Sequence, residues 1–389
     1  MSTAPDPSGH VVHEIRWSDA LPWWLLFRAA AAAFSPTVIL LAALGAVATW
    51  AGWTVADKLG LPGADPIATE IASGEGIVLP VPAGVAMTPG PLEPSRAAVP
   101  WLHVLIQRVP RPIGDLLTLV AIPTRPTSTV AQSGAALARL GWLILVWSIF
   151  GTGIARHVGL RLAGEDAPGP LGALLFGSRS WLPAFNAVLF VLCGIAALSV
   201  PGALLGLAMR TDWGLAAAGV VWPLVLLGAV VLAILAAGLA VGWPLMVACV
   251  GVERGDSFQA ISTAFSYVYQ RPLHYVFYGL VALAVAVPAL AAAALFADLT
   301  GTLAVWAASF GMGHARTEAV IDGLASGAAV TAPWGVRAIG FWHRSLAHLL
   351  ASFGWGYFWA FATSAYLLLR RDVDGTELDE VVIDEPGEQ

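Results

Sequence analysis

Charge is scarce in this sequence of 389 residues, and lysine is nearly missing. Asp, Glu, Lys and Arg make up 11% of the chain, whereas a soluble domain carries about 25% charged residues. Lys58 is the single lysine among 19 basic residues, and the net charge of -6 gives no support for a nucleic-acid partner. Hydrophobic residues reach 58%, and apolar runs of roughly 20 residues recur. We therefore expect a lipid bilayer to surround most of the chain.

Sequence features of enzymes and of secreted proteins are also missing. Cys193 and Cys249 are the two cysteines, and both lie in apolar runs, which favours buried thiols over a disulfide or a metal site. Residues 1–20 contain acids and prolines but no early hydrophobic stretch, so no cleavable signal is expected. The chain has no Gly-x-Ser-x-Gly motif and no phosphate-binding glycine loop. We expect neither enzyme activity nor a cofactor.

Two patterns that suggest a metal ion are incomplete. Residues 372–375 read Asp-Val-Asp-Gly, but an EF-hand with this glycine at its sixth position would lack acidic residues at its first and last positions. His314 and Glu318 are four residues apart and could share one helical face, yet no third ligand is in register with them. We therefore expect no metal site.

The apolar stretches predict an all-α fold: a polytopic transmembrane helical bundle with about six spans and interfacial amphipathic helices. The expected spans are 36–56, 135–155, 182–207, one within 215–250, 275–295 and 346–369. No charged residue lies deep in any of them. Since ion pathways and intramembrane proteases of the aspartyl or metal type need such residues, this absence argues against both.

These spans divide the chain into five segments. They are an N-terminal cytoplasmic and interfacial segment (1–33), the first span (34–56), a proline-rich external loop (57–130), a five-span membrane domain (131–370) and an acidic cytoplasmic tail (371–389). Arginines are concentrated in the connections 156–181 and 251–272 and just after the last span, at Arg370 and Arg371. The positive-inside rule then predicts a bacterial inner-membrane protein with both termini in the cytoplasm.

The stretch 242–278 carries the strongest local signal in the chain. One span ends in it, a charged cluster and an amphipathic helix follow, and another span begins. Asp256 is a favourable N-cap for this helix, and Pro272 ends it because proline disfavours a helical conformation at the preceding residue. Phe258 and Phe265 belong to one apolar stripe, which we expect to face lipid or neighbouring spans.

Two roles for this amphipathic helix remain open. It either packs between two spans or couples the membrane domain to a cytosolic or membrane protein partner. The candidate coupling or docking residues are Glu253, Arg254, Asp256, Phe258, Phe265 and Arg271.

A weak internal repeat supports the same layout. The second span is followed by Glu165, a short apolar helix near 171–176, and Arg179. The fourth span is followed by Glu253, the amphipathic helix and Arg271. Parallel repeats of this kind occur in transporters, and chance similarity between two apolar segments explains the pattern equally well.

Two blocks of the sequence resemble those of an uncharacterised family of polytopic membrane proteins from planctomycete-type bacteria. The blocks read GWPLM…VERGDSFQAISTAFSYVYQRPLHYVFY and FW…AYLLLRRDVDGTELDEV. The unit of span, acidic residue, amphipathic helix and span is also distantly similar to the membrane domain attached to some bacterial glycerophosphodiester phosphodiesterases. The resemblance covers about the last two-thirds of the chain, and it implies an architecture but no catalytic residues.

The sequence therefore favours a non-enzymatic membrane component, either a scaffold or a permease-like subunit. The alternative is a transporter for an uncharged or lipidic substrate that passes through the bundle without meeting buried charges. The expected partners are the lipid bilayer and a cytosolic or membrane protein.

Overall fold

The fold is known from a computed structural model, which describes residues 21–61, 119, 122, 129–325, 332–378 and 380. Within these ranges the chain is helical and has no β-strand, so the predicted all-α class is confirmed. The elements are η1 (Pro22–Trp24), α2 (Leu25–Ala33), α3 (Pro36–Lys58), α7 (Val130–Ala163), α8 (Pro170–Ala208), α9 (Asp212–Glu253), α10 (Ser257–Gln270), α11 (Pro272–Met312), α12 (His314–Ala325) and α13 (Trp334–Asp374). Nearly all of the expected loop 57–130 and most of the segment 1–33 lie outside the described residues.

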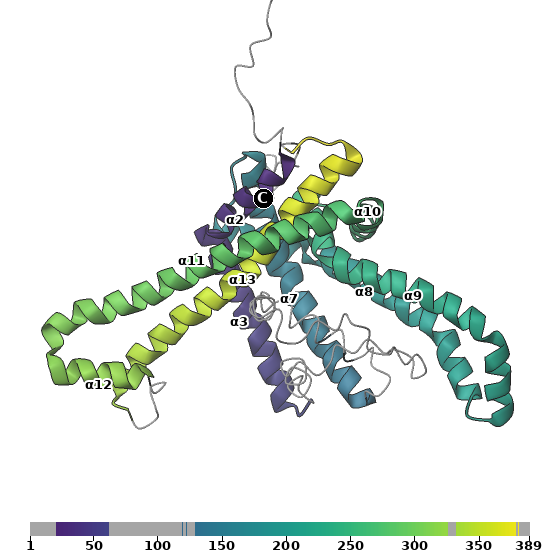
Figure 1. Ribbon diagram of the computed structural model, residues 1–389, viewed down its shortest axis with the longest axis horizontal. Coiled ribbons are helices and arrows are strands. Elements are labelled where there is room, and N and C mark those ends of the chain that lie inside the picture. The colour runs from purple at the N-terminus through teal and green to yellow at the C-terminus, as the bar shows by residue number, and fades with distance from the viewer. Residues whose placement is uncertain are drawn as a thin grey trace, which may run out of the picture.

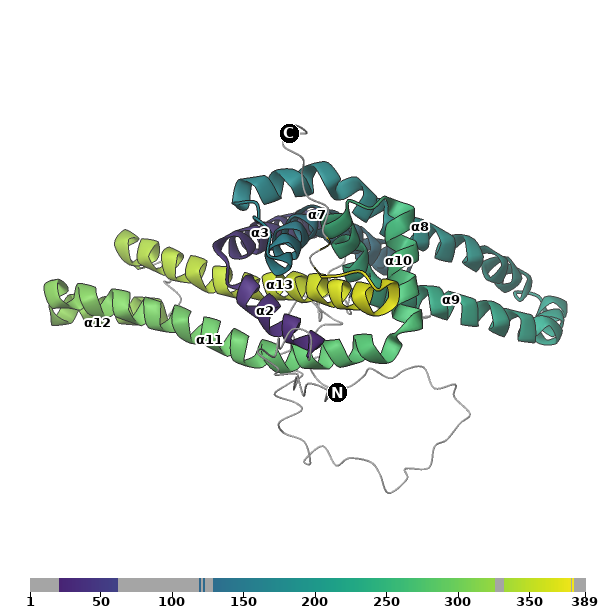
Figure 2. The same ribbon diagram turned by 90° about the horizontal axis from the view of Figure 1, so that it is seen from above.

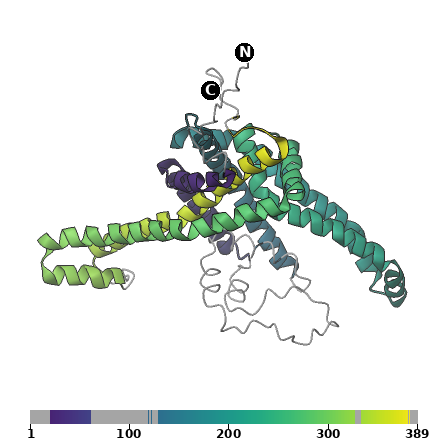
Figure 3. The same cartoon turned by 45° about the horizontal axis from the view of Figure 1, so that its top comes forward.

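The helices form a central hub with arms that diverge from it (Figure 1). The hub contains α2, α10 and the ends of α7, α9 and α13. One arm is the antiparallel pair of α8 and α9, another contains α11, α12 and the first half of α13, and α3 and α7 extend between them (Figures 1 and 3). Seen from above, α13 runs through the centre of the hub between α11 on one side and α3 and α7 on the other (Figure 2).

Polar side chains and prolines determine where several helices begin. Ser35 caps α3 by accepting a hydrogen bond from the backbone N–H of Val38 at 3.4 Å, and a proline follows it at the first helical position. Thr129 and Gln132 form a reciprocal capping box at the start of α7. These caps matter because the first N–H groups of a helix have no partner within the helix.

Glycines let α7 contact its neighbours closely. A Cβ atom added to Gly153 of α7 would lie 2.5 Å from the carbonyl oxygen of Ala173 in α8. A Cβ atom on Gly251 of α9 would lie 2.6 Å from the Cβ atom of Ala155 in α7. Small residues allow this approach between backbones in membrane proteins, where helix association depends on tight packing. α7 is therefore the axis around which the hub is built.

A cluster of tryptophans fills the space between α7, α9 and α13. Trp147 stacks on Trp355 with ring centroids 4.2 Å apart, and Trp243 meets Trp359 edge-on at 5.4 Å. All four rings are buried. Aromatic pairs in these geometries stabilise a core by about 0.5–1.5 kcal/mol beyond the area that they bury.

Five helices are long and apolar enough to cross a membrane: α3, α7, α8, α9 and α11. They contain five of the six expected spans. The sixth, 346–369, lies within α13, which is rich in tryptophan, tyrosine and small polar residues and therefore has a lower mean hydropathy. α9 has 42 residues and measures about 63 Å, about twice the hydrocarbon thickness of a bilayer. The arms therefore either lean strongly or extend beyond the hydrocarbon.

One expected helix boundary was wrong, and a second helix is longer than the span expected within it. The short helix near 171–176 is the first part of α8, which continues through Pro183 and Pro201 as one helix of 39 residues. Each proline removes only one backbone N–H, and the remaining hydrogen bonds of the helix keep it intact in an apolar environment. The span 135–155 is part of a longer helix, so Arg156 lies inside α7 and not after it.

An ion pair joins α3 and α7 at the ends that lie far from the hub. Arg139 of α7 donates from Nη2 to Asp57 Oδ1 at 2.5 Å, and its side chain is 7% exposed. Trp53 of α3 adds a hydrogen bond from Nε1 to the carbonyl oxygen of Arg139 at 3.3 Å. We call this pair the clamp; it holds the last turn of α3 against the first part of α7.

Candidate functional site

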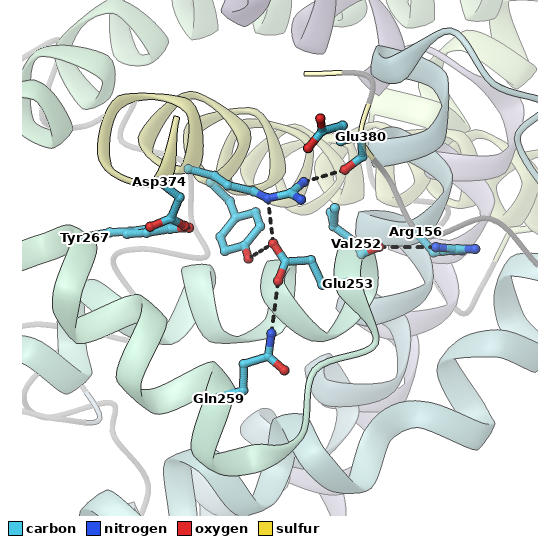
Figure 4. A network of polar contacts seen from close by, with 9 residues as sticks. Arg156, Val252, Glu253, Gln259, Tyr267, Asp374 and Glu380 are labelled. Atoms are coloured by element: carbon cyan, nitrogen blue, oxygen red, sulfur yellow. Dashed lines mark hydrogen bonds and ion pairs between the residues drawn. The ribbon is translucent and has the colours of Figure 1, made fainter. Parts of the chain in front are cut away.

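Glu253, the last residue of α9, is the centre of a polar junction in the hub (Figure 4). Its Oε1 atom accepts a hydrogen bond from the Tyr366 hydroxyl at 2.6 Å and lies 2.8 Å from Arg370 Nε. Its Oε2 atom accepts a hydrogen bond from Gln259 Nε2 at 3.1 Å. We call Glu253, Gln259, Tyr366 and Arg370 the Glu253 junction. The junction ties α9, α10 and α13 together through one carboxylate.

Little water reaches the ion pair of this junction. The side chains of Glu253 and Arg370 are only 16% and 14% exposed. Removing one partner of such a pair leaves the other charge desolvated and destabilises the fold more than the intact pair stabilises it. The junction therefore holds α10 in one position relative to the membrane helices.

Tyrosines provide a second set of ties to the end of α13. The Tyr267 hydroxyl of α10 donates to the Asp374 carboxylate, and the Tyr278 hydroxyl of α11 donates to Asp372 Oδ2 at 2.7 Å. Burial, followed by the hydrogen bond and charge of Asp374, raises the pKa of Tyr267 above its ordinary value, so the phenol remains a donor. The expected acidic tail thus begins as helix, because α13 continues through Asp374 and ends at Gly375 in the left-handed conformation.

Arg156 and Arg254 both lie next to Phe176 of α8, close to the Glu253 junction. Their guanidinium carbons lie 5.1 Å and 5.7 Å from the centroid of that ring, within cation–π distance. Arg156 is 1% exposed and donates from Nη1 to the carbonyl oxygen of Val252 at 3.3 Å. Arg254, among the described residues, is the only non-glycine with a positive φ, at 57°. This left-handed residue ends α9 and turns the chain toward α10.

His157 links two helix starts and had no signal in the sequence. Its Nδ1 atom lies 2.8 Å from the Pro168 carbonyl oxygen, and its Nε2 atom lies 3.2 Å from Ser35 Oγ. Since a carbonyl only accepts, Nδ1 carries the proton; His157 is buried, which favours the neutral ring in which Nε2 accepts from the serine hydroxyl. The neutral ring therefore joins the start of α3 to the turn between α7 and α8.

The predicted docking residues fall into different surroundings. Asp256 caps α10 as expected, since its Oδ1 atom accepts from the backbone N–H of Gln259 at 2.7 Å. Arg271 separates α10 from α11, and Pro272 opens α11. Of the six predicted residues, the structure brings Glu253 into the junction and leaves Arg254 beside Phe176, so they do not form a single cluster.

The fully buried face of α10 is offset from the predicted stripe, but the stripe also contacts protein: a Cβ atom added to Gly238 of α9 would lie 2.5 Å from the ring of Phe265. The buried residues are Ala260, Ala264 and Tyr267. Phe258 is 71% exposed and stacks on Phe190 of α8 at 5.4 Å. The alanines are fully buried where α10 lies close against its neighbours, Phe265 packs against the core while partly exposed, and Phe258 is the ring that remains mostly exposed.

The sequence pattern did not indicate Tyr366 as a partner of Glu253. Tyr366 and Arg370 are four residues apart on α13 and so share one face, which is a signal that the sequence does carry. Pairing that face with Glu253 requires a contact across 113 residues, and no local pattern encodes it.

The parts of the chain that the structure describes contain no group of three or more His, Cys, Asp or Glu side chains that could hold a metal ion. His314 and Glu318 do contact each other, with Nε2 and Oε1 3.2 Å apart, on an exposed face of α12. No family model, curated protein or solved structure matches this chain. The resemblance to the planctomycete-type family therefore stays a prediction.

Proposed function

We propose that this protein is a non-enzymatic component of a bacterial inner membrane, a scaffold or permease-like subunit that presents α10 to a cytosolic protein. The observation that supports this role is the way in which α10 is held. The Glu253 junction fixes its first turn, and the Tyr267–Asp374 hydrogen bond fixes its last. A short helix held at both ends, outside the spans and still exposed along its length, is suited to docking a partner without rearrangement.

The face that would bind this partner follows from the helical period. At 100° per residue, Gln259, Thr263, Ser266 and Gln270 lie on one side of α10, between the protein-facing alanines and the phenylalanine stripe. We call these four residues the polar edge. Gln259 and Gln270 are exposed, and Gln270 Nε2 donates to Ser266 Oγ at 2.6 Å.

Site-specific photo-crosslinking in cells tests this role. A photoreactive residue at Gln270, on the polar edge, is expected to give a discrete adduct with a cytosolic protein. The same residue at Phe258, on the apolar stripe, is the matched control and should give no such adduct. Equal adducts from both positions, or none from Gln270 in a protein that reaches normal levels in the membrane, would contradict the docking role.

The orientation is tested separately. Because Arg370 and Arg371 follow the last expected span, we place both termini in the cytoplasm. A reporter that is active only in the periplasm should stay inactive when fused after Gln389, and activity there would reverse the orientation.

A second function, transport of an uncharged or lipidic substrate, has its own supporting observation. The arm of α11, α12 and α13 contains a cavity of about 630 Å³ whose walls are mainly apolar. Such a role predicts movement of a lipid between the leaflets of reconstituted vesicles, and a docking scaffold does not.

A further inference from the structure

The cavity in the arm of α11, α12 and α13 has an unusual combination of linings. Most of its walls are apolar or carry hydroxyl groups, including Val305, Leu346 and Thr302. Asp298 is the one formally charged side chain among the described residues that line it. The described part of the chain gives this carboxylate no hydrogen bond and no ion pair. Asp298 is exposed at the cavity, which therefore presents one accessible negative charge beside apolar walls.

The residues on α11 that line the cavity share one helical face. Asp298, Thr302 and Trp306 recur every four residues, with Gly301 beside them. The absence of a side chain at Gly301 leaves room for His343 of α13, because a Cβ atom there would lie 3.2 Å from its Nδ1 atom. The close approach of these two helices places the imidazole in the wall of the cavity.

The cavity lies at a defined depth along the arm. Asp298 comes three residues after the expected span 275–295, and His343 comes three residues before the expected span 346–369. α11 and α13 run side by side in opposite directions (Figures 1 and 2), so with these expected spans both residues lie about 4.5 Å along the helix axis past the span ends, on the same side of the membrane. This is the level of lipid head groups, and Trp306 lies about two helical turns further from the hydrocarbon on the same face of α11. With the termini in the cytoplasm, this end faces the outside.

We propose that this cavity binds an ammonium group that is attached to an apolar body. The Asp298 carboxylate supplies the counter-charge, and the face of Trp306 supplies a cation–π contact. The hydroxyls of Thr302 and Thr317 accept hydrogen bonds from N–H groups, and the apolar walls contact the attached hydrocarbon. An anion is disfavoured because it would meet the carboxylate. This inference goes beyond the docking role of α10 and does not depend on it.

Two sources could supply such an ammonium group: the head group of an amine-bearing lipid, or a free amine. The test uses the full chain in nanodiscs that contain equal amounts of phosphatidylethanolamine and phosphatidylglycerol. Native mass spectrometry then counts the lipids that remain bound to the protein after release from the disc. We expect the wild type to retain the ethanolamine lipid at least tenfold over the glycerol lipid, a difference of about 1.4 kcal/mol.

Two substitutions and one control decide the result. Asp298→Asn preserves shape and removes the charge, so the preference should fall to about one. Trp306→Leu should lower it several-fold. Asp322→Asn removes an exposed carboxylate from α12 that does not line the cavity, and the preference should stay unchanged. A preference that survives Asp298→Asn, or is lost equally in Asp322→Asn, would overturn the proposal, as would a wild type without preference.

Competition distinguishes the two sources. If millimolar ethanolamine displaces the bound lipid from the wild type, the site accepts the free amine. If the lipid stays bound, the attached hydrocarbon is part of the ligand. The assay measures occupancy alone, so its outcome is independent of whether the protein transports lipid or docks a partner.

Discussion

The helices are buried against protein in the hub but are largely exposed in the arms. In α7, which forms the axis of the hub, 61% of the most apolar 18-residue window is buried inside the protein, whereas the corresponding value for α9 is 6%. The arms therefore depend on lipid for their surroundings, and their helices persist because every backbone group is bonded within the helix. The hub depends on specific contacts: tight glycine crossings, stacked tryptophans and a carboxylate with three donors. Specific contacts in the hub therefore fix how the helices are placed relative to one another, whereas the sequence of the arms mainly sets helix length and hydrophobicity.

The largest contrast should come from the Glu253 junction. Glu253→Ala leaves Arg370 without its counter-charge in a site that is only 14% exposed, and we expect a loss of about 3–5 kcal/mol of stability. Leu226→Ala in the arm, where the side chain is 55% exposed to the surroundings, should change stability by about 0.5 kcal/mol or less. Thermal unfolding followed by size-exclusion in detergent measures both. Similar losses of stability in the two variants would contradict the view that the hub depends on specific contacts and the arms do not.

Two glycines of the same helix provide a sharper comparison. Gly251→Ala in the hub end of α9 forces a methyl group against Ala155, and overpacking of this kind costs about 1–3 kcal/mol. Gly219→Ala in the arm end meets no neighbour within 4 Å and should stabilise α9 by up to about 1 kcal/mol, because alanine is the better helix former. Opposite shifts of the unfolding temperature are expected. A shift of the same sign in both would show that the close crossing of α7 and α9 is wrong.

The Tyr267 hydroxyl makes the hub sensitive to high pH. Its folded-state pKa is raised, so the folded protein keeps a proton that the unfolded chain releases near pH 10. The stabilisation is complete below about pH 10 and is lost progressively as the pH rises above that value. Tyr267→Phe should lower stability by about 1–2 kcal/mol at neutral pH and flatten this alkaline decline. An unchanged decline in the variant would assign it to other groups.

The smallest effect concerns thiol labelling and leaves stability unchanged. Cys249 is buried in the hub, whereas Cys193 is exposed on α8 in the arm. In intact membranes neither should react with an impermeant maleimide, and a lipid-soluble maleimide should label Cys193 alone. Labelling of Cys249 before denaturation would mean that the hub opens to water.

The sequence predicted the helical class and most spans because each rests on local apolar patterning. It also predicted the cap at Asp256 and the break at Pro272, which depend on residues within one or two turns. It could not predict that Ala260 and Ala264 would replace Phe258 on the protein side, since that choice depends on how closely α9 approaches. The same limit explains why Tyr366 and His157 were missed: their partners are distant in the chain and ordinary in type.

The clamp between Asp57 and Arg139 has a consequence for the segment between α3 and α7. Because the two helices are already joined there, the end of α3 and the start of α7 are held in a fixed relative position. The entropy of closing such an excursion rises by only about 0.6 kcal/mol for each doubling of its length. Leu119 and Ile122 are buried, and Leu119 belongs to the hydrophobic core, so changes of length should leave the membrane helices undisturbed only where they fall before residue 119. Insertions and deletions there should be tolerated, provided that Asp57 and Arg139 stay in place.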